Sequence, residues 1–128
     1  MKPPRWWPPA AYSRRELMIV KRIGKTRKLF VFLRAHRLEI FDDALQAKLV
    51  GMYRGAGKAP VAPALLAMVV LLQAYVGISD AEAVQLSVLD VRWQLVLDTL
   101  TDDAPPFSQG ALVLQIRSPF RVPEGLRY

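Results

Sequence analysis

The hydrophobic positions of the chain recur mostly with the period of an α-helix. Steps of three or four residues separate Leu38, Phe41, Leu45, Leu49 and Met52. This spacing places the five side chains on one face, so the pattern predicts an amphipathic core helix over 38–52. Only residues 29–33 have a pattern that is ambiguous between helix and strand.

Two further helices are predicted from their first residues. Ser13 stands three residues before Glu16, and Ser79 stands three residues before Glu82. In this capping-box spacing the serine hydroxyl accepts from a backbone amide of the first turn, and the glutamate accepts from the serine amide. We therefore expect a short basic helix over about 14–22 and a second helix over about 80–89.

The C-terminal third continues the helical pattern. Asp90 is placed to cap a helix over 91–100, in which Trp93, Leu97 and Leu100 face inward. Residues 101–106 predict a turn, and Ser108 precedes another helix start at Gln109.

The most apolar stretch lies between these elements. Residues 59–79 contain no charged side chain, which is long enough to consider a membrane span. However, Pro60 and Pro63 precede the helix and Gly77 ends it, so its continuous part covers 64–76, roughly 20 Å against the ~30 Å of a hydrocarbon core. A buried helix is the better interpretation.

The elements together predict an all-α fold, a small helical bundle with a central pair of helices joined at Gly77. Such a pair is also the form of a DNA-binding helix-turn-helix. Gln73 stands where that motif commonly has a small alanine, and carboxylates begin the second helix, although Gln85 and Ser87 are candidates for base contacts. A structural role is favoured over base recognition on these residues alone.

Three segments are expected along the chain: a basic proline-rich arm with a short helix over 1–28, a helical domain over 29–113, and an irregular tail over 114–128. The first twelve residues contain four prolines and two adjacent tryptophans. Because proline does not support a helix interior, we expect this lead to be extended and flexible.

Positive charge is concentrated at the N-terminus. Residues 1–37 contain eleven bases and one acid, whereas the remainder contains seven bases and ten acids. Clustered bases favour a polyanionic partner, because phosphate contacts release condensed counterions; a solvated basic tail is the alternative. The predicted DNA-phosphate contacts are Arg14, Arg15, Lys21, Arg22, Lys25, Arg27, Lys28, Arg34 and Arg37.

The sequence predicts no catalytic, metal or cofactor site. It has no cysteine and one histidine, His36, so a disulfide framework, a cysteine–metal site and a nucleophilic triad lack their residues; a cytoplasmic setting is the simplest expectation. Gly57-Lys58 does not make a phosphate loop, since Ala59 replaces the required Ser or Thr. The adjacent acids at 42–43 and 102–103 do not converge as a two-metal site requires.

Several segments in order resemble a known family. They are Leu38 to Asp43, Pro63 with Leu65 to Gln73, Gly77 to Ala83, Asp90 with Trp93, Asp98 to Leu100, and Phe107 to Leu112. Over about residues 32–113 the chain is similar to the N-terminal domain of InsH-like insertion-sequence transposases of the DDE class. The resemblance implies a role in DNA transposition, DNA as partner, and self-association or association with a full-length transposase.

In that family the helical domain precedes a catalytic domain whose acids bind two metal ions. Here the sequence after Val113 is LQIRSPFRVPEGLRY, where the family leads us to expect a Phe-Arg pair and further arginine. We therefore expect a non-catalytic fragment, truncated or frameshifted before the catalytic domain. The alternative is a protein-interaction or membrane-surface module in which residues 65–78 form an exposed apolar patch.

Overall fold

The computed structural model describes residues 2–52 and 61–113 of the chain. The described part contains α-helices and no strand. The helices are α1 (Arg14–Ile23), α2 (Lys28–Ile40), α3 (Asp43–Gly51), α4 (Pro63–Val76), α5 (Asp80–Leu89), α6 (Val91–Leu97) and α7 (Gln109–Ala111). The predicted all-α bundle is confirmed, and residues 29–33 belong to α2.

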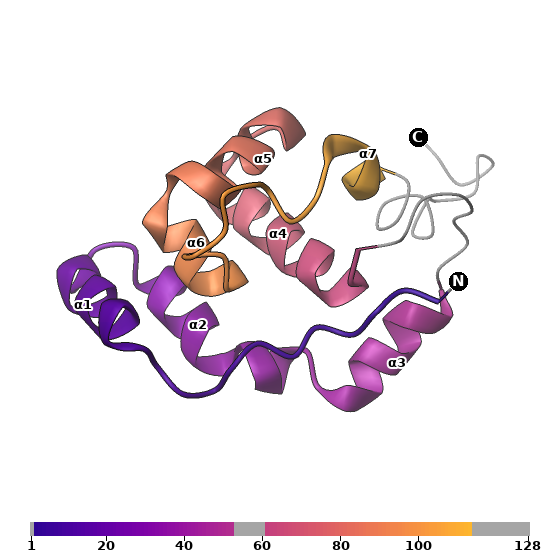
Figure 1. The fold of residues 1–128 in the computed structure, drawn as a ribbon, viewed down its shortest axis with the longest axis horizontal. Helices are drawn as coiled ribbons and strands as arrows, with labels where there is room; N and C mark the ends of the chain where they lie inside the picture. Colours follow the sequence, from indigo (N-terminus) through magenta and orange to yellow (C-terminus); the bar gives the residue numbers. More distant parts are fainter. Residues whose placement is uncertain (1, 53–60, 114–128) are drawn as a thin grey trace.

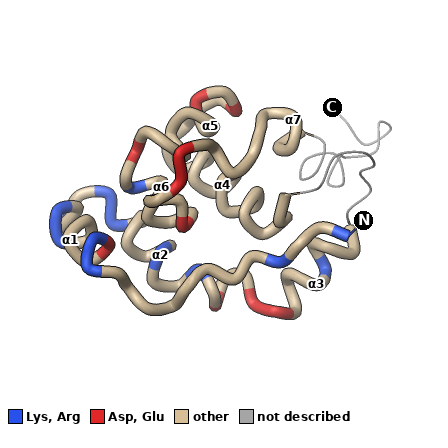
Figure 2. Tube along the Cα trace, viewed as in Figure 1, with Lys and Arg blue, Asp and Glu red and all other residues tan. Residues whose placement is uncertain are grey.

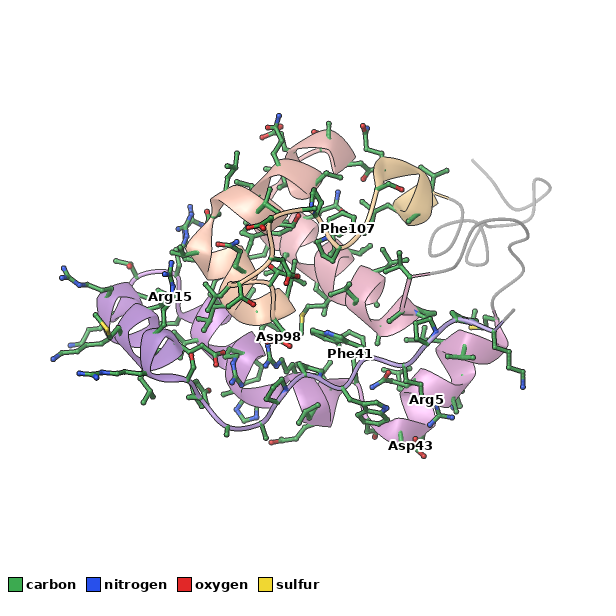
Figure 3. All side chains as sticks on the ribbon, in the orientation of Figure 1. Arg5, Arg15, Phe41, Asp43, Asp98 and Phe107 are labelled. Atoms are coloured by element: carbon green, nitrogen blue, oxygen red, sulfur yellow. The ribbon has the colours of Figure 1, made fainter. Side chains whose placement is uncertain are left out.

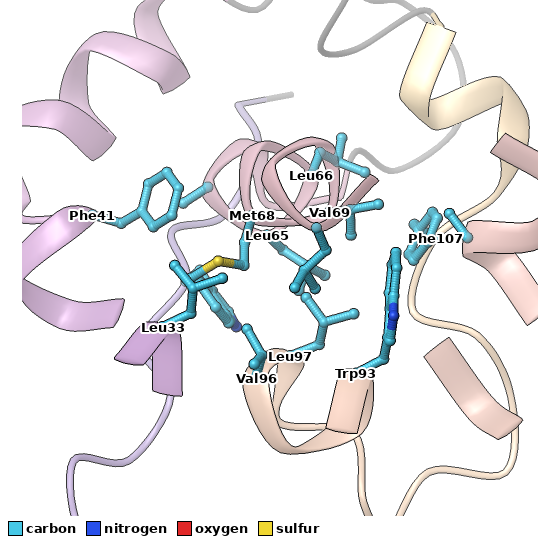
Figure 4. Packing of buried hydrophobic residues seen from close by; sticks show 14 of the residues in the cluster. Leu33, Phe41, Leu65, Leu66, Met68, Val69, Trp93, Val96, Leu97 and Phe107 are labelled. Carbon is cyan, nitrogen blue, oxygen red and sulfur yellow. The ribbon is translucent and has the colours of Figure 1, made fainter. Parts of the chain in front are cut away.

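Helix α4 forms the centre of the core. Leu66, Met68, Val69 and Leu72 have no exposed surface, and Ala64 is 1% exposed. Figure 4 shows Leu66, Met68 and Val69 on α4, with Leu33 and Phe41 on one side of the helix and Trp93 and Phe107 on the other. The apolar stretch is a buried core helix, as predicted.

Helix α6 is short but almost completely enclosed. All five residues from Trp93 to Leu97 are buried, and the helix contacts α1, α2, α4 and α5. The Asp90 side chain caps its start by accepting from the amide of Arg92. The helix ends at Asp98, whose φ of 62° is left-handed, so it stops three residues before the predicted end at residue 100.

The predicted single helix over 38–52 is wrong, because the chain breaks there into α2 and α3. Phe41 and Asp42 lie between the two helices, and the Asp42 side chain accepts from the amide of Leu45 as the N-cap of α3. An aspartate at this position offers the backbone a cap in place of continued helix. Hydrophobic spacing alone does not detect the break, since Phe41 at the break and Leu49 after it are both buried.

The N-terminal lead is extended, as predicted, and it is packed along the body. Figure 1 shows it running past α2 and α3. Trp6 is 9% exposed and joins the same core as Ile23 and α4. The segment preceding α1 is therefore part of the folded unit.

Candidate nucleic-acid interface

Helix α1 is fixed by its first turn. The predicted capping box is present: the Ser13 hydroxyl accepts from the Glu16 amide at 3.1 Å, and Glu16 Oε1 accepts from the Ser13 amide at 2.9 Å. The inner face presents Glu16 and Ile23 to the body, both buried. The remaining positions of α1 lie on its outer or flanking faces.

A buried ion pair joins α1 to α2. Arg34 Nε donates to Glu16 Oε2 at 2.6 Å, and the two side chains are 2% and 10% exposed. Burial tends to raise the pKa of Glu16, but the hydrogen bonds from Arg34 and from the Ser13 amide, with the charges of Arg34 and Arg37, lower this pKa below its usual value. The carboxylate is thus charged, and its ion pair attaches α1 to α2.

The outer surface around α1 is strongly basic. It consists of seven exposed side chains on α1, on the turn after it and at the start of α2: Arg14, Arg15, Lys21, Arg22, Lys25, Arg27 and Lys28. Within the described ranges none of the seven forms an ion pair. Figure 2 shows these bases gathered at one end of the molecule, and Figure 3 places Arg15 there, far from Arg5 and Asp43 at the α3 end. We call these seven residues the basic surface.

Two apolar side chains lie among the bases of α1. Leu17 and Met18 are 56% and 60% exposed. Met18 is three residues after Arg15 and four before Arg22, so a helix places the three on adjoining turns of one face. The outward face of α1 therefore combines positive charge with apolar atoms.

The basic surface continues toward the C-terminal end of α4. The Arg27 guanidinium lies over the Tyr75 ring, 5.7 Å from its centroid, and Tyr75 makes an edge contact with Phe30 at 5.8 Å between centroids. Arg92 lies over the other member of this pair, Phe30, at 5.1 Å. Arg92 is itself paired with Asp90 at 2.7 Å, so its charge is compensated.

Arg34 and Arg37, the last two predicted phosphate contacts, are not on this surface. They are 2% and 1% exposed. Arg37 donates to the carbonyls of Leu95 and Val96, which are left without helical partners at the end of α6. Burial and the nearby charge of Arg34 lower the pKa of Arg37 to about 10, which leaves it charged at neutral pH. Because both guanidinium groups are used inside the fold, we leave them out of the proposed interface.

A sequence signal for these buried roles was available. Glu16 is the only acid among the first 37 residues, and it lies on the inner side of a predicted helix. A buried carboxylate requires a paired base, so at least one nearby lysine or arginine had to face inward. Sequence reasoning could not identify which one.

The central helix pair does not provide a basic recognition helix. Helices α4 and α5 meet at 102°, within the range of helix-turn-helix pairs. Gln73, at the position of the expected alanine, donates to the Asp80 carboxylate at 2.8 Å across the turn. Of the two candidates for base contacts, Gln85 is exposed, but Ser87 is fully buried and its hydroxyl donates to the Val84 carbonyl. Helix α5 contains two acids and no base.

The start of α5 differs slightly from the prediction. The Ser79 hydroxyl accepts from the Glu82 amide at 3.2 Å, as expected. The Glu82 carboxylate lies 3.4 Å from the same hydroxyl rather than accepting from the Ser79 amide. Of the predicted capping box, only the hydrogen bond from the Glu82 amide to the Ser79 hydroxyl is present.

Several carboxylates have structural partners. Asp42 caps α3, Asp43 pairs with Arg5, and Asp90 both caps α6 and pairs with Arg92. Over residues 2–52 and 61–113, no group of three or more acid, histidine or cysteine side chains is arranged to hold a metal ion. His36 pairs with Glu39 at 3.2 Å and contacts the Phe32 ring.

The apolar stretch provides little exposed surface. Leu71 and Tyr75 are its only large hydrophobic side chains above one-third exposure, at 43% and 37%. Residues 65–78 therefore do not form the exposed apolar patch that the alternative interpretation requires. No single described helix is long and apolar enough to cross a membrane; α4 and α5 reach the required length and hydropathy only together, across their bend.

The fold and the surface define a small all-helical domain with one basic end. The chain belongs to the family described as Transposase domain (DUF772), whose family model matches residues 26–113. Searches of curated proteins and of solved structures found no match. The family assignment connects the chain with transposition, as the sequence resemblance implied. Five bases of the basic surface, Arg14, Arg15, Lys21, Arg22 and Lys25, precede the matched segment.

The irregular tail expected over 114–128 falls outside the described residues.

Proposed function

We propose that this chain is a DNA-binding domain used in transposition, and that the basic surface contacts the phosphates of duplex DNA. The observation that carries the proposal is the set of seven exposed bases at one end of the fold, none of them ion-paired within the described part of the chain. Such bases repel one another in the free protein, and a polyanion relieves this repulsion. The family membership supports DNA as the polyanion.

The geometry of α1 suggests how the contact is made. Its inner face is anchored by the Glu16–Arg34 pair, so its basic outer face is presented on a fixed support. Phosphate contacts of this kind position a protein on DNA without selecting a sequence. Met18, exposed between Arg15 and Arg22, is the side chain on this face best suited to an apolar base-edge contact.

We further propose that this domain does not itself cut or join DNA. Asp42, Asp43, Asp90 and Glu16 each have a structural partner, so their carboxylates serve caps and ion pairs. Two-metal strand transfer requires carboxylates that converge on ions ~4 Å apart. The role we assign is to bring DNA to a transposition complex, with the non-catalytic fragment proposed from the sequence as one form of it.

Four exposed lysines allow a matched test of the surface. Lys21→Gln with Lys25→Gln removes two charges from the basic surface, whereas Lys2→Gln with Lys48→Gln removes two charges from exposed positions outside it. Both double variants have the same net charge, so general electrostatic attraction is equal. Affinity for a labelled random duplex is measured by fluorescence anisotropy at one fixed salt concentration.

We expect the Lys21/Lys25 variant to bind about 10-fold or more weakly than the Lys2/Lys48 variant, from roughly two lost phosphate contacts at about 0.7 kcal/mol or more each. Equal losses in the two variants would show that only net charge matters and would contradict a located interface. Circular dichroism of both variants checks that the helices are intact.

A further inference from the structure

The N-terminal lead is bound by side chains of the body as a peptide would be. Between residues 2 and 12 the backbone makes no hydrogen bond to other backbone groups of the described residues. Its carbonyls instead accept from three polar side chains of α2 and α3, namely Arg34, Arg37 and Gln46, each at most 2% exposed. We call the surface formed by these three side chains and Phe41 the arm groove.

Gln46 binds one residue of the lead at two points. Its Oε1 accepts from the Trp6 amide at 2.6 Å, and its Nε2 donates to the Trp6 carbonyl at 2.8 Å. The Trp6 ring makes an edge contact with Phe41, at 6.1 Å between centroids. This combination fixes the register of the lead, because the residue that bonds to the Gln46 amide is also the one whose ring contacts Phe41.

The two buried arginines bind the following residues of the lead. Arg37 Nη2 donates to the Pro9 carbonyl at 2.9 Å, and Arg34 Nη2 donates to the Ala11 carbonyl at 2.8 Å. The Arg34 guanidinium also lies over the Tyr12 ring, 4.0 Å from its centroid. Prolines at 8 and 9 restrict the lead to an extended form before it binds, which lowers the entropy cost of ordering it.

An empty arm groove is unfavourable. Without the lead, Gln46 loses both of its Trp6 partners, Arg37 loses the Pro9 carbonyl, and Arg34 loses the Ala10 and Ala11 carbonyls. Leaving such groups without partners is unfavourable. Trp6 returns to water as well. The groove therefore strongly favours an occupied state, but nothing in these contacts requires the lead to come from the same chain.

We propose that the arm groove is a binding site for an extended Trp-Pro segment, and that its second occupant is the lead of another copy of this chain. Exchange of identical leads preserves every contact described above, so its cost is confined to the connection with α1. That connection is short: the last groove carbonyl is that of Ala11, and the capping Ser13 follows two residues later.

The Arg5–Asp43 ion pair at the far end of the groove provides a reporter of exchange. Because the chain contains no cysteine, Arg5→Cys and Asp43→Cys each introduce a unique thiol. Full-length Arg5→Cys chains and affinity-tagged Asp43→Cys chains are mixed at high concentration, treated with a short bismaleimide, and analysed by mass after denaturation. Only an exchanged lead brings the two thiols together across chains.

We expect a cross-linked heterodimer several-fold in excess of that given by Arg5→Cys mixed with Gln85→Cys, whose thiol lies on the exposed face of α5. Adding Trp6→Ala to the Arg5→Cys chain should reduce the heterodimer to the control amount. A chain with both Arg5→Cys and Asp43→Cys measures the unexchanged form as an internally cross-linked monomer whose share rises on dilution.

A heterodimer no more abundant than the Gln85→Cys control would overturn the proposal and show that the lead stays on its own body. Absence of both the heterodimer and the internal cross-link would overturn the arm groove itself. The experiment contains no nucleic acid, so its result is independent of the proposed DNA-binding function.

Discussion

Burial separates two groups of arginines that are alike in the sequence. Arg15 and Arg22 are exposed on α1, whereas Arg34 and Arg37 are buried and bind a carboxylate and five backbone carbonyls of the described chain between them. The delocalised, planar guanidinium suits this internal role because it can serve several acceptors at once. The same residue type therefore stabilises the fold at two positions and provides the proposed DNA surface at others.

The Glu16–Arg34 pair makes stability depend on pH. The pKa of Glu16 is lowered in the folded state, so the charged carboxylate contributes stability above its ordinary value of 4.5, and this contribution is lost as the pH falls through the lower folded value. Glu16→Gln should cost about 2–3 kcal/mol at pH 7, less than the ~3–5 kcal/mol for deleting a buried partner, because the amide oxygen still accepts.

The measurement is urea unfolding of both proteins between pH 3 and pH 7. The difference in unfolding free energy should be largest near neutral pH and shrink in acid. Glu82→Gln, at an exposed position of α5, serves as control and should change stability by no more than about 0.5 kcal/mol. A Glu16→Gln deficit that is constant over this range would contradict the assigned ion pair.

Arg37 provides a second test, which separates stability from DNA binding. Arg37→Met removes the partners of the Pro9, Leu95 and Val96 carbonyls and should lower the unfolding free energy by about 3–5 kcal/mol. Arg15→Met, at an exposed site, should lower it by no more than about 0.5 kcal/mol.

The effects of the two substitutions on DNA binding should have the opposite order to their effects on stability. Arg15→Met reduces the magnitude of the salt slope by about 0.9, whereas folded Arg37→Met leaves the slope unchanged. Thermal melts and anisotropy titrations of the same samples provide both readouts. A reduced salt slope in folded Arg37→Met would show that Arg37 contacts DNA and would contradict its internal role.

Caps determine where the helices begin more reliably than hydrophobic spacing does. Ser13, Ser79 and Asp90 begin α1, α5 and α6 where the sequence predicts these helices. The start of α3 after Asp42 was missed, because a continuous hydrophobic face conceals a cap there. An aspartate within a helical pattern is compatible with a continuous helix and with a break that starts a new one. Packing of Phe41 against Trp6, 35 residues away in the chain, favours the break.

Asp42→Ala tests that boundary. Loss of the hydrogen bond from the Leu45 amide should cost about 1 kcal/mol, as is typical of N-cap replacements. Asp103→Ala removes an acid from the exposed turn after α6 and should cost less than about 0.5 kcal/mol. Chemical denaturation measures both variants, and equal costs would argue that Asp42 is not a significant cap.

At the scale of the whole molecule, the fold keeps charge and core apart. Helices α4 and α6 fill the centre, while α1 carries four of its bases outward at one end. The acids of α5 lie on a different helix, so the domain has a distinct basic end. This separation directs a phosphate backbone toward α1 and the start of α2.

The sequence predicted this arrangement only in part. The helical class, the buried α4 and the basic N-terminal third follow from periodicity, length and charge, which are local properties. The packed lead and the internal roles of Arg34 and Arg37 depend on partners such as Gln46 and the carbonyls of α6, which are distant in the chain. The sequence shows which side chains can donate hydrogen bonds, but it does not show which acceptors the fold places beside them.

The most direct test of the central claim is the salt dependence of duplex DNA binding by the unmodified chain. If the basic surface contacts phosphates, the logarithm of the association constant should fall linearly with the logarithm of salt concentration, with a slope between about −3 and −6, since seven bases set the upper limit. Binding that is undetectable at low salt, or a slope near zero, would contradict the account.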